Sequence, residues 1–72
     1  MSRDGSAGVT INGELRRVAG GTSLAGLLAA IGLDPTRVAV ERNLAIVPRS
    51  TFGEVMVEDD DAYEIVHFVG GG

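Results

Sequence analysis

The stretch VTINGELRRVA, residues 9–19, predicts a β-hairpin. Apolar and polar side chains alternate over residues 9–11, which is typical of a strand with one buried face. Asn12-Gly13 favours a two-residue type I′ turn, because both central residues of that turn need a positive φ. Residues 14–19 then form the return strand. We expect Leu15 to pack inward and the two arginines after it to lie near a solvated edge.

A short amphipathic helix is predicted after the hairpin. Thr22 or Ser23 can cap its N-terminus by accepting a hydrogen bond from a free backbone N–H group. Gly32 fits the position after the last turn, where a positive φ is favoured, and Pro35 prevents continuation. One helix face is apolar, because large side chains recur at spacings of three and four residues: Leu24, Leu27, Leu28 and Ile31.

The second half of the chain is typical of short strands joined by turns. Residues 37–41 alternate valine with other side chains, Arg42-Asn43 is expected to turn, and the apolar run 44–47 stops at Pro48. The next turn is expected over residues 50–53.

Two more strands are predicted towards the C-terminus. Residues 55–57 form a brief strand, and residues 62–69 form the longest one. The acidic run 58–61 between them is expected to be a solvated turn rather than a cation site, because adjacent carboxylates point in different directions.

The order of these elements, β-β-α-β-β-β, indicates one α+β domain in which the helix covers one face of a mixed sheet. Periodicity gives only this order. The strand order is taken from the β-grasp, or ubiquitin-like, fold, in which the final strand lies parallel to the first, between the first and the third. We therefore expect a flexible leader over 1–8, a β-grasp domain over 9–69 and a flexible glycine tail over 70–72.

Composition excludes several classes of protein. The 72 residues contain ten acidic and six basic side chains, all six of them arginine, with one histidine and no cysteine. Disulfides, zinc fingers, iron–sulfur clusters and a cysteine nucleophile are therefore excluded. An acidic chain is a poor ligand for nucleic acid or an anionic membrane. We expect no metal site and no bound cofactor. We also expect a cytoplasmic location, since no basic region leads into an apolar signal segment at the N-terminus.

The glycine tail is the feature that points to chemistry. The chain runs through an apolar strand and ends in Gly70-Gly71-Gly72. Because glycine has no Cβ atom, such a tail can extend through a channel too narrow for other residues. Its functional group is the α-carboxylate of Gly72, which becomes electrophilic if ATP activates it to an acyl-adenylate.

With this tail, the sequence resembles the ubiquitin-like sulfur carriers. The segment NLAIVPR, residues 43–49, is similar to the N-x-x-I-V-P-R segment of the ThiS family, and residues 9–13 and 59–61 also resemble it. The resemblance covers residues 9–72. Phe52 stands where the family usually has tryptophan. Asp60 stands where it usually has glycine, and aspartate tolerates a left-handed backbone better than most residues.

The resemblance implies a sulfur carrier, a protein cosubstrate rather than an enzyme. An E1-like, ThiF-type adenylyltransferase would use ATP to adenylate Gly72, and a cysteine desulfurase system would convert the C-terminus to a thiocarboxylate. A ThiG-type thiazole synthase would then accept the sulfur during thiamine biosynthesis. Because the helix covers one sheet face, the other should expose apolar residues of the final strand, and we expect Phe68 to anchor the adenylyltransferase and the synthase. Ile46, Pro48 and Arg49 are the other expected partner-binding residues.

Two alternative functions use the same tail. The small subunit of molybdopterin synthase is activated in the same way, but the I-V-P-R segment and the short chain disfavour it. A protein modifier would form isopeptide bonds, and trapped conjugates would distinguish it from a carrier, which would show a free thiocarboxylate.

Overall fold

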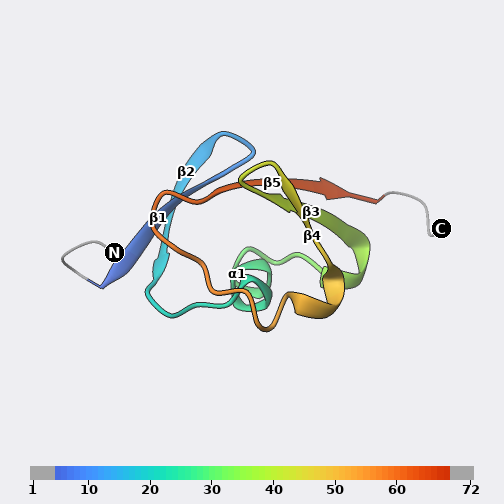
Figure 1. The fold of residues 1–72 in the computed structure, drawn as a ribbon, viewed down its shortest axis with the longest axis horizontal. Coiled ribbons are helices and arrows are strands. Elements are labelled where there is room, and N and C mark those ends of the chain that lie inside the picture. The colour runs from blue at the N-terminus through green and yellow to red at the C-terminus, as the bar shows by residue number, and fades with distance from the viewer. Residues whose placement is uncertain (1–4, 69–72) are drawn as a thin grey trace.

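The computed structural model describes residues 5–68, which form a mixed five-stranded sheet with a helix against one face (Figure 1). The strand order is β2-β1-β5-β3-β4, and β5 runs parallel to β1 and antiparallel to β3. This arrangement confirms the β-grasp prediction. The strands are β1 (Ser6–Ile11), β2 (Glu14–Ala19), β3 (Val38–Arg42), β4 (Ala45–Val47) and β5 (Ala62–His67); the helix is α1 (Leu24–Ala30).

The first hairpin forms at Asn12-Gly13 as predicted, but it differs in two details. Strand β1 begins at Ser6 rather than at residue 9, so residues 6–8 of the expected leader pair with β2. Leu15 does not pack inward, and 72% of its surface is exposed. The two-residue turn sets Leu15 opposite Thr10, and facing residues of an antiparallel pair share a sheet face. Leu15 therefore lies on the face away from α1.

Helix α1 begins and ends at the predicted signals. The Ser23 hydroxyl accepts a hydrogen bond of 3.0 Å from the backbone N–H of Gly26. At the other end, Gly32 has a φ of 80°, and the N–H of Leu33 donates to the carbonyl of Leu28 at 2.9 Å. These bonds satisfy backbone groups that the helix ends leave free.

The core lies between α1 and the sheet. Three leucines of the helix are fully buried against the inward side chains of β1, β3 and β5. Phe52 supplies an aromatic anchor from the loop after β4, with only 4% of its surface exposed. The core consists of Val9, Leu24, Leu27, Leu28, Val38, Val40, Phe52, Val57, Tyr63 and Ile65.

The connections in the second half differ from the sequence predictions. The β3–β4 turn is formed by Asn43 and Leu44, both with positive φ, rather than by Arg42-Asn43. Residues 55–57 form no strand, because only Met56 pairs, in an isolated bridge with Ser23. Two short 3₁₀ helices were not predicted: η1 (Pro35–Arg37) and η2 (Arg49–Thr51).

Candidate functional site

Strand β5 leads to the glycine tail, and the side chain of Asn12 helps to hold it. The backbone N–H of Asn12 donates to the carbonyl of Tyr63 at 2.8 Å. Its amide then bonds to both backbone groups of Ile65, donating to the carbonyl at 3.1 Å and accepting from the N–H at 2.8 Å. Asn12 has a φ of 52°, so the β1 backbone has already turned away. The side chain therefore extends the β1–β5 pairing beyond the end of β1.

Asn43 holds the start of the same strand in a similar way. Its backbone N–H donates to the carbonyl of Ala62 at 2.7 Å, and its side-chain oxygen accepts from the N–H of Ala62 at 2.9 Å. It too lies in a hairpin turn with a positive φ, of 50°. Two asparagine turns thus fix the register of β5. At the other end of the strand, the N–H of Phe68 donates to the carbonyl of Arg37 at 2.8 Å.

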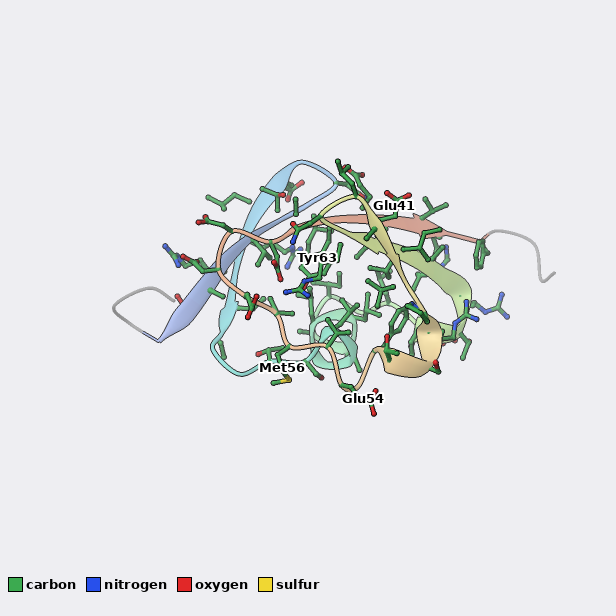
Figure 2. The ribbon with its side chains drawn as sticks, in the orientation of Figure 1. Glu41, Glu54, Met56 and Tyr63 are labelled. Carbon is green, nitrogen blue, oxygen red and sulfur yellow. The ribbon has the colours of Figure 1, made fainter. Side chains whose placement is uncertain are left out.

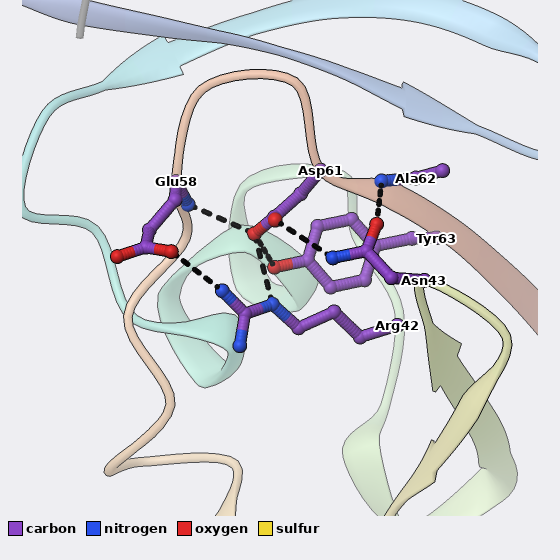
Figure 3. Close-up of polar contacts among 6 residues, drawn as sticks. All are labelled: Arg42, Asn43, Glu58, Asp61, Ala62 and Tyr63. Carbon is purple, nitrogen blue, oxygen red and sulfur yellow. Dashed lines mark hydrogen bonds and ion pairs between the residues drawn. The ribbon is translucent and has the colours of Figure 1, made fainter.

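The carboxylate of Asp61 organises the turn that enters β5 (Figure 3). The expectation of a wholly solvated acidic turn is wrong, since only 5% of Asp61 is exposed. Four groups donate to its oxygens: the Arg42 Nε at 3.0 Å, the Tyr63 hydroxyl at 2.9 Å, the Asn43 amide at 3.2 Å and the backbone N–H of Glu58 at 2.9 Å. A buried carboxylate is tolerable here because its lone pairs are occupied.

The pKa values of this cluster follow from its hydrogen bonds. Burial raises the pKa of Asp61, but the bonds donated by Glu58, Arg42, Tyr63 and Asn43 outweigh it, so the pKa lies below its usual value. Burial, together with the bond to Asp61, raises the pKa of the Tyr63 hydroxyl. Asp61 is therefore ionised and Tyr63 neutral near pH 7, which suits a structural cluster rather than an acid–base pair.

The sheet face away from α1 is uncovered in the described residues. Strand pairing places Glu41, Ile46, Glu64 and Val66 on this face, and Figure 2 shows Glu41 pointing away from α1. We call this surface the open sheet face. Its exposed apolar side chains are Leu15 (72% exposed), Ile46 (79%), Val66 (61%) and Phe68 (48%).

Sequence reasoning found two of those four apolar residues. Leu15 and Val66 were not predicted to lie on this face. The two-residue turn could have placed Leu15 there, and the alternation of side chains along β5 could have placed Val66. The sequence did not predict that Glu41 and Glu64 lie opposite each other, because this depends on the pairing of β3 with β5.

The predicted partner-binding residues do not form one cluster. Ile46 and Pro48 line a shallow hollow of about 230 Å³ beside β4. Arg49 instead donates to the backbone carbonyls of Pro35 at 2.8 Å and Val38 at 3.1 Å, which ties η2 to η1 and to the start of β3. Phe68 lies at the end of β5. The tail residues Gly70, Gly71 and Gly72 lie outside the described residues.

Two other features of the described residues bear on function. Within 5–68, no group of three or more histidine, aspartate or glutamate side chains is arranged to hold a metal ion. In the same part of the chain, no helix has the length and apolar character needed to cross a membrane.

Comparison with known sequences identifies a family. The model of the ThiS family matches residues 9–72. A thiazole synthase of Magnetococcus marinus is 50% identical over 64 residues, which is 89% of this chain but 20% of that protein. The sulfur carrier protein ThiS of Bacillus subtilis is 50% identical over 46 residues, covering 64% of this chain and 70% of that one. The chain thus spans about a fifth of the thiazole synthases that it matches.

Comparison with solved structures identifies the same family. The crystal structure of the thiamine biosynthesis protein ThiS from Geobacter metallireducens superposes with a TM-score of 0.74 at 34% identity. The match covers 90% of this chain and 99% of that one. The likeness therefore extends over almost the whole β-grasp domain.

Proposed function

The chain belongs to the ThiS family, and on that premise we propose that it carries sulfur for thiazole formation in thiamine biosynthesis. The observation that carries the proposal is the family match, which extends through Gly72. The thiazole synthases among its relatives support a ThiG-type synthase as the acceptor of the sulfur. A cytoplasmic location stays a prediction.

The reacting group in this proposal is the C-terminal carboxylate of Gly72. A ThiF-type adenylyltransferase joins it to the α-phosphate of ATP, and pyrophosphate leaves. A persulfide sulfur from a cysteine desulfurase system then attacks the acyl carbon, and AMP leaves. Cleavage of the resulting S–S bond by a thiol gives the thiocarboxylate. The chain supplies the carboxylate and a docking surface, and its partners supply the catalysis.

Mass spectrometry tests the proposal directly. The intact mass of the native polypeptide establishes whether it ends at Gly72. After incubation with ATP, the adenylyltransferase and the sulfur donor, the mass should increase by the difference between one sulfur and one oxygen atom. A chain that is found only as isopeptide conjugates would identify a protein modifier instead.

Removing Gly72 should abolish adenylation without changing the fold. The shortened chain ends in the same kind of carboxylate on Gly71, but its reach falls by about 3.3–3.6 Å. Reacting atoms must approach to about 3–3.5 Å, so this shortfall prevents reaction. ATP–pyrophosphate exchange measures the loss, and an unchanged melting temperature shows that the fold is retained.

Two substitutions in the tail extend this test. Gly71→Val should also block adenylation, because a β-branched side chain restricts the backbone and fills a narrow channel. Gly70→Ala should have a milder effect. If the chain lacking Gly72 still forms a thiocarboxylate at nearly the wild-type rate, the proposed carrier function is wrong.

A further inference from the structure

The turn of the first hairpin contains the single Asn-Gly pair of the chain, Asn12-Gly13. In such a pair the backbone nitrogen of the glycine can attack the side-chain amide carbon of the asparagine, because no side chain shields that nitrogen. The reaction closes a succinimide ring and releases ammonia. Asparagine is one of the thermolabile residues of proteins. The pair is therefore a candidate site of covalent modification.

The turn leaves the attacking nitrogen open to water. Both residues of the pair are exposed. In the described part of the chain, no atom beyond the two chain neighbours of Gly13 lies within 4 Å of the position that a Cβ atom would take there. Hydroxide can therefore reach the N–H of Gly13 and remove its proton.

Strand β5 holds the amide of Asn12 away from this reaction. The amide oxygen accepts from the N–H of Ile65 at 2.8 Å, and the amide nitrogen donates to the carbonyl of Ile65 at 3.1 Å. Ring closure makes the amide carbon tetrahedral and expels the nitrogen, so the donated bond must break. The side chain must also turn from Ile65 towards Gly13. The reaction therefore requires Asn12 to leave β5 first.

Modification would weaken the connection between β1 and β5. In the described residues these strands pair at two positions, so the side chain of Asn12 adds substantially to their connection. An aspartate in its place has no donor for the carbonyl of Ile65 and brings a negative charge beside that oxygen. An isoaspartate lengthens the backbone of a two-residue turn by one carbon atom. Either product loosens the strand that leads towards the tail.

We propose that Asn12 is a deamidation site that the closed sheet protects, and that it converts to aspartate or isoaspartate when β5 separates from the hairpin turn. The Gly13 nitrogen loses its proton to hydroxide and bonds to the amide carbon, and ammonia leaves with a proton taken from water. Water then opens the succinimide at either of its carbonyls. This inference does not depend on the proposed function.

Intact mass spectrometry of the wild-type chain in mildly alkaline buffer tests the proposal. The chain has two asparagines and no glutamine, so a mass increase equal to the difference between a hydroxyl and an amino group can come only from Asn12 or Asn43. Peptide mapping distinguishes the two. Asn12 should convert in urea, and about tenfold or more slowly in the folded chain. Without urea, Leu28→Ala should convert faster than the wild type, because it opens more often.

Asn43 is the control within the chain. It also has a positive φ, of 50°, and its side chain also accepts a bond from a backbone group of β5, the N–H of Ala62. The side chain of Leu44, however, shields the next backbone nitrogen. Asn43 should stay unmodified in urea while Asn12 converts. Gly13→Ala should slow the conversion of Asn12 when both chains are compared in urea, where the folded turn imposes no strain.

Asn12→Asp reproduces one of the two products. It should melt at a lower temperature than the wild type, because the carbonyl of Ile65 loses its donor. Ser50→Asp is the charge-matched control, since Ser50 is exposed in η2, and it should melt like the wild type.

Three results would overturn the inference. Equal rates for Asn12 in the folded chain and in urea would show that β5 does not protect it. No conversion of Asn12 in urea, or conversion of Asn43 at the same rate, would show that the Asn-Gly pair is not a distinct site. A melting temperature of Asn12→Asp equal to that of Ser50→Asp would show that the modification does not loosen the sheet. The proposed function is unaffected by each result, because adenylation is not measured.

Discussion

At the scale of single residues, Asp61 shows how a carboxylate becomes part of a small core. It accepts hydrogen bonds from Arg42, Asn43, Tyr63 and the backbone of Glu58, which come from β3, the β3–β4 turn, β5 and the acidic turn (Figure 3). One buried charge thereby joins four segments. The cost of burying it is offset by charge-assisted bonds, each stronger than a neutral one.

Asp61→Asn should lower stability at pH 7 by about 1–3 kcal/mol, because the amide leaves several donors without a good acceptor. The substitution should also change how the free energy of unfolding depends on pH in the acidic range. The pKa of Asp61 is lowered by folding from its usual 3.8, so its contribution is complete above about pH 4 and is lost as the pH falls through the folded pKa. Urea unfolding at pH 7 and pH 3 should therefore differ less in the variant than in the wild type.

Asp60→Asn provides the control for this prediction. Asp60 lies in the same turn with an exposed side chain and a φ of 70°, which asparagine also tolerates. It should unfold like the wild type at both pH values. An equally flattened pH dependence in Asp60→Asn would show that the effect comes from general charge rather than from the Asp61 bonds.

At the scale of elements, α1 is stable only because it packs against the sheet. Its seven residues are too few for a stable isolated helix, and glycine lies in its interior. Burial of Leu24, Leu27 and Leu28 against the sheet provides the stabilisation. The sheet depends equally on the helix, because the inward side chains of β1, β3 and β5 would otherwise face water.

Leu28→Ala should lower the free energy of unfolding by about 2–5 kcal/mol through lost burial and the cavity left behind. A domain this small has a total stability of about 5 kcal/mol, so the variant should be largely unfolded or close to it. Leu15→Ala is the matched control, since Leu15 is 72% exposed. If Leu28→Ala melts within a few degrees of the wild type, the buried face of α1 is assigned wrongly.

At the scale of the whole molecule, the two faces of the sheet differ in the side chains that they carry. The face towards α1 holds the core, and the open sheet face displays apolar and acidic side chains. We therefore predict that substitutions on the open sheet face change partner binding more than they change stability.

Phe68→Ala tests this separation, because Phe68 is 48% exposed. We expect it to reduce adenylation more than it reduces stability, as measured by pyrophosphate exchange and a thermal melt. Met56→Ala is a suitable control, since Met56 is 46% exposed and lies on the other side of the molecule (Figure 2). Equal losses of adenylation and stability in Phe68→Ala would mean that Phe68 is a core residue.

The sequence by itself predicted the features that arise from neighbouring residues. Asn12-Gly13 indicated the hairpin, the leucine spacing indicated the helix face, and the family resemblance supplied the strand order. The chemistry of the glycine tail stays a prediction. The orientation of Leu15 was also within reach, because a two-residue turn fixes which residues face each other.

Only the tertiary structure decided which side chains act together across the sheet. Asn12 bonds to Ile65, 53 residues away in the chain, and Glu41 opposes Glu64 because β3 and β5 pair in one particular register. Asp61 is buried by partners from several segments. A shift of one residue in the pairing of β3 with β5 would place Glu41 and Glu64 on different faces. Register between distant strands is set by packing of the whole core, and local patterns do not contain that information.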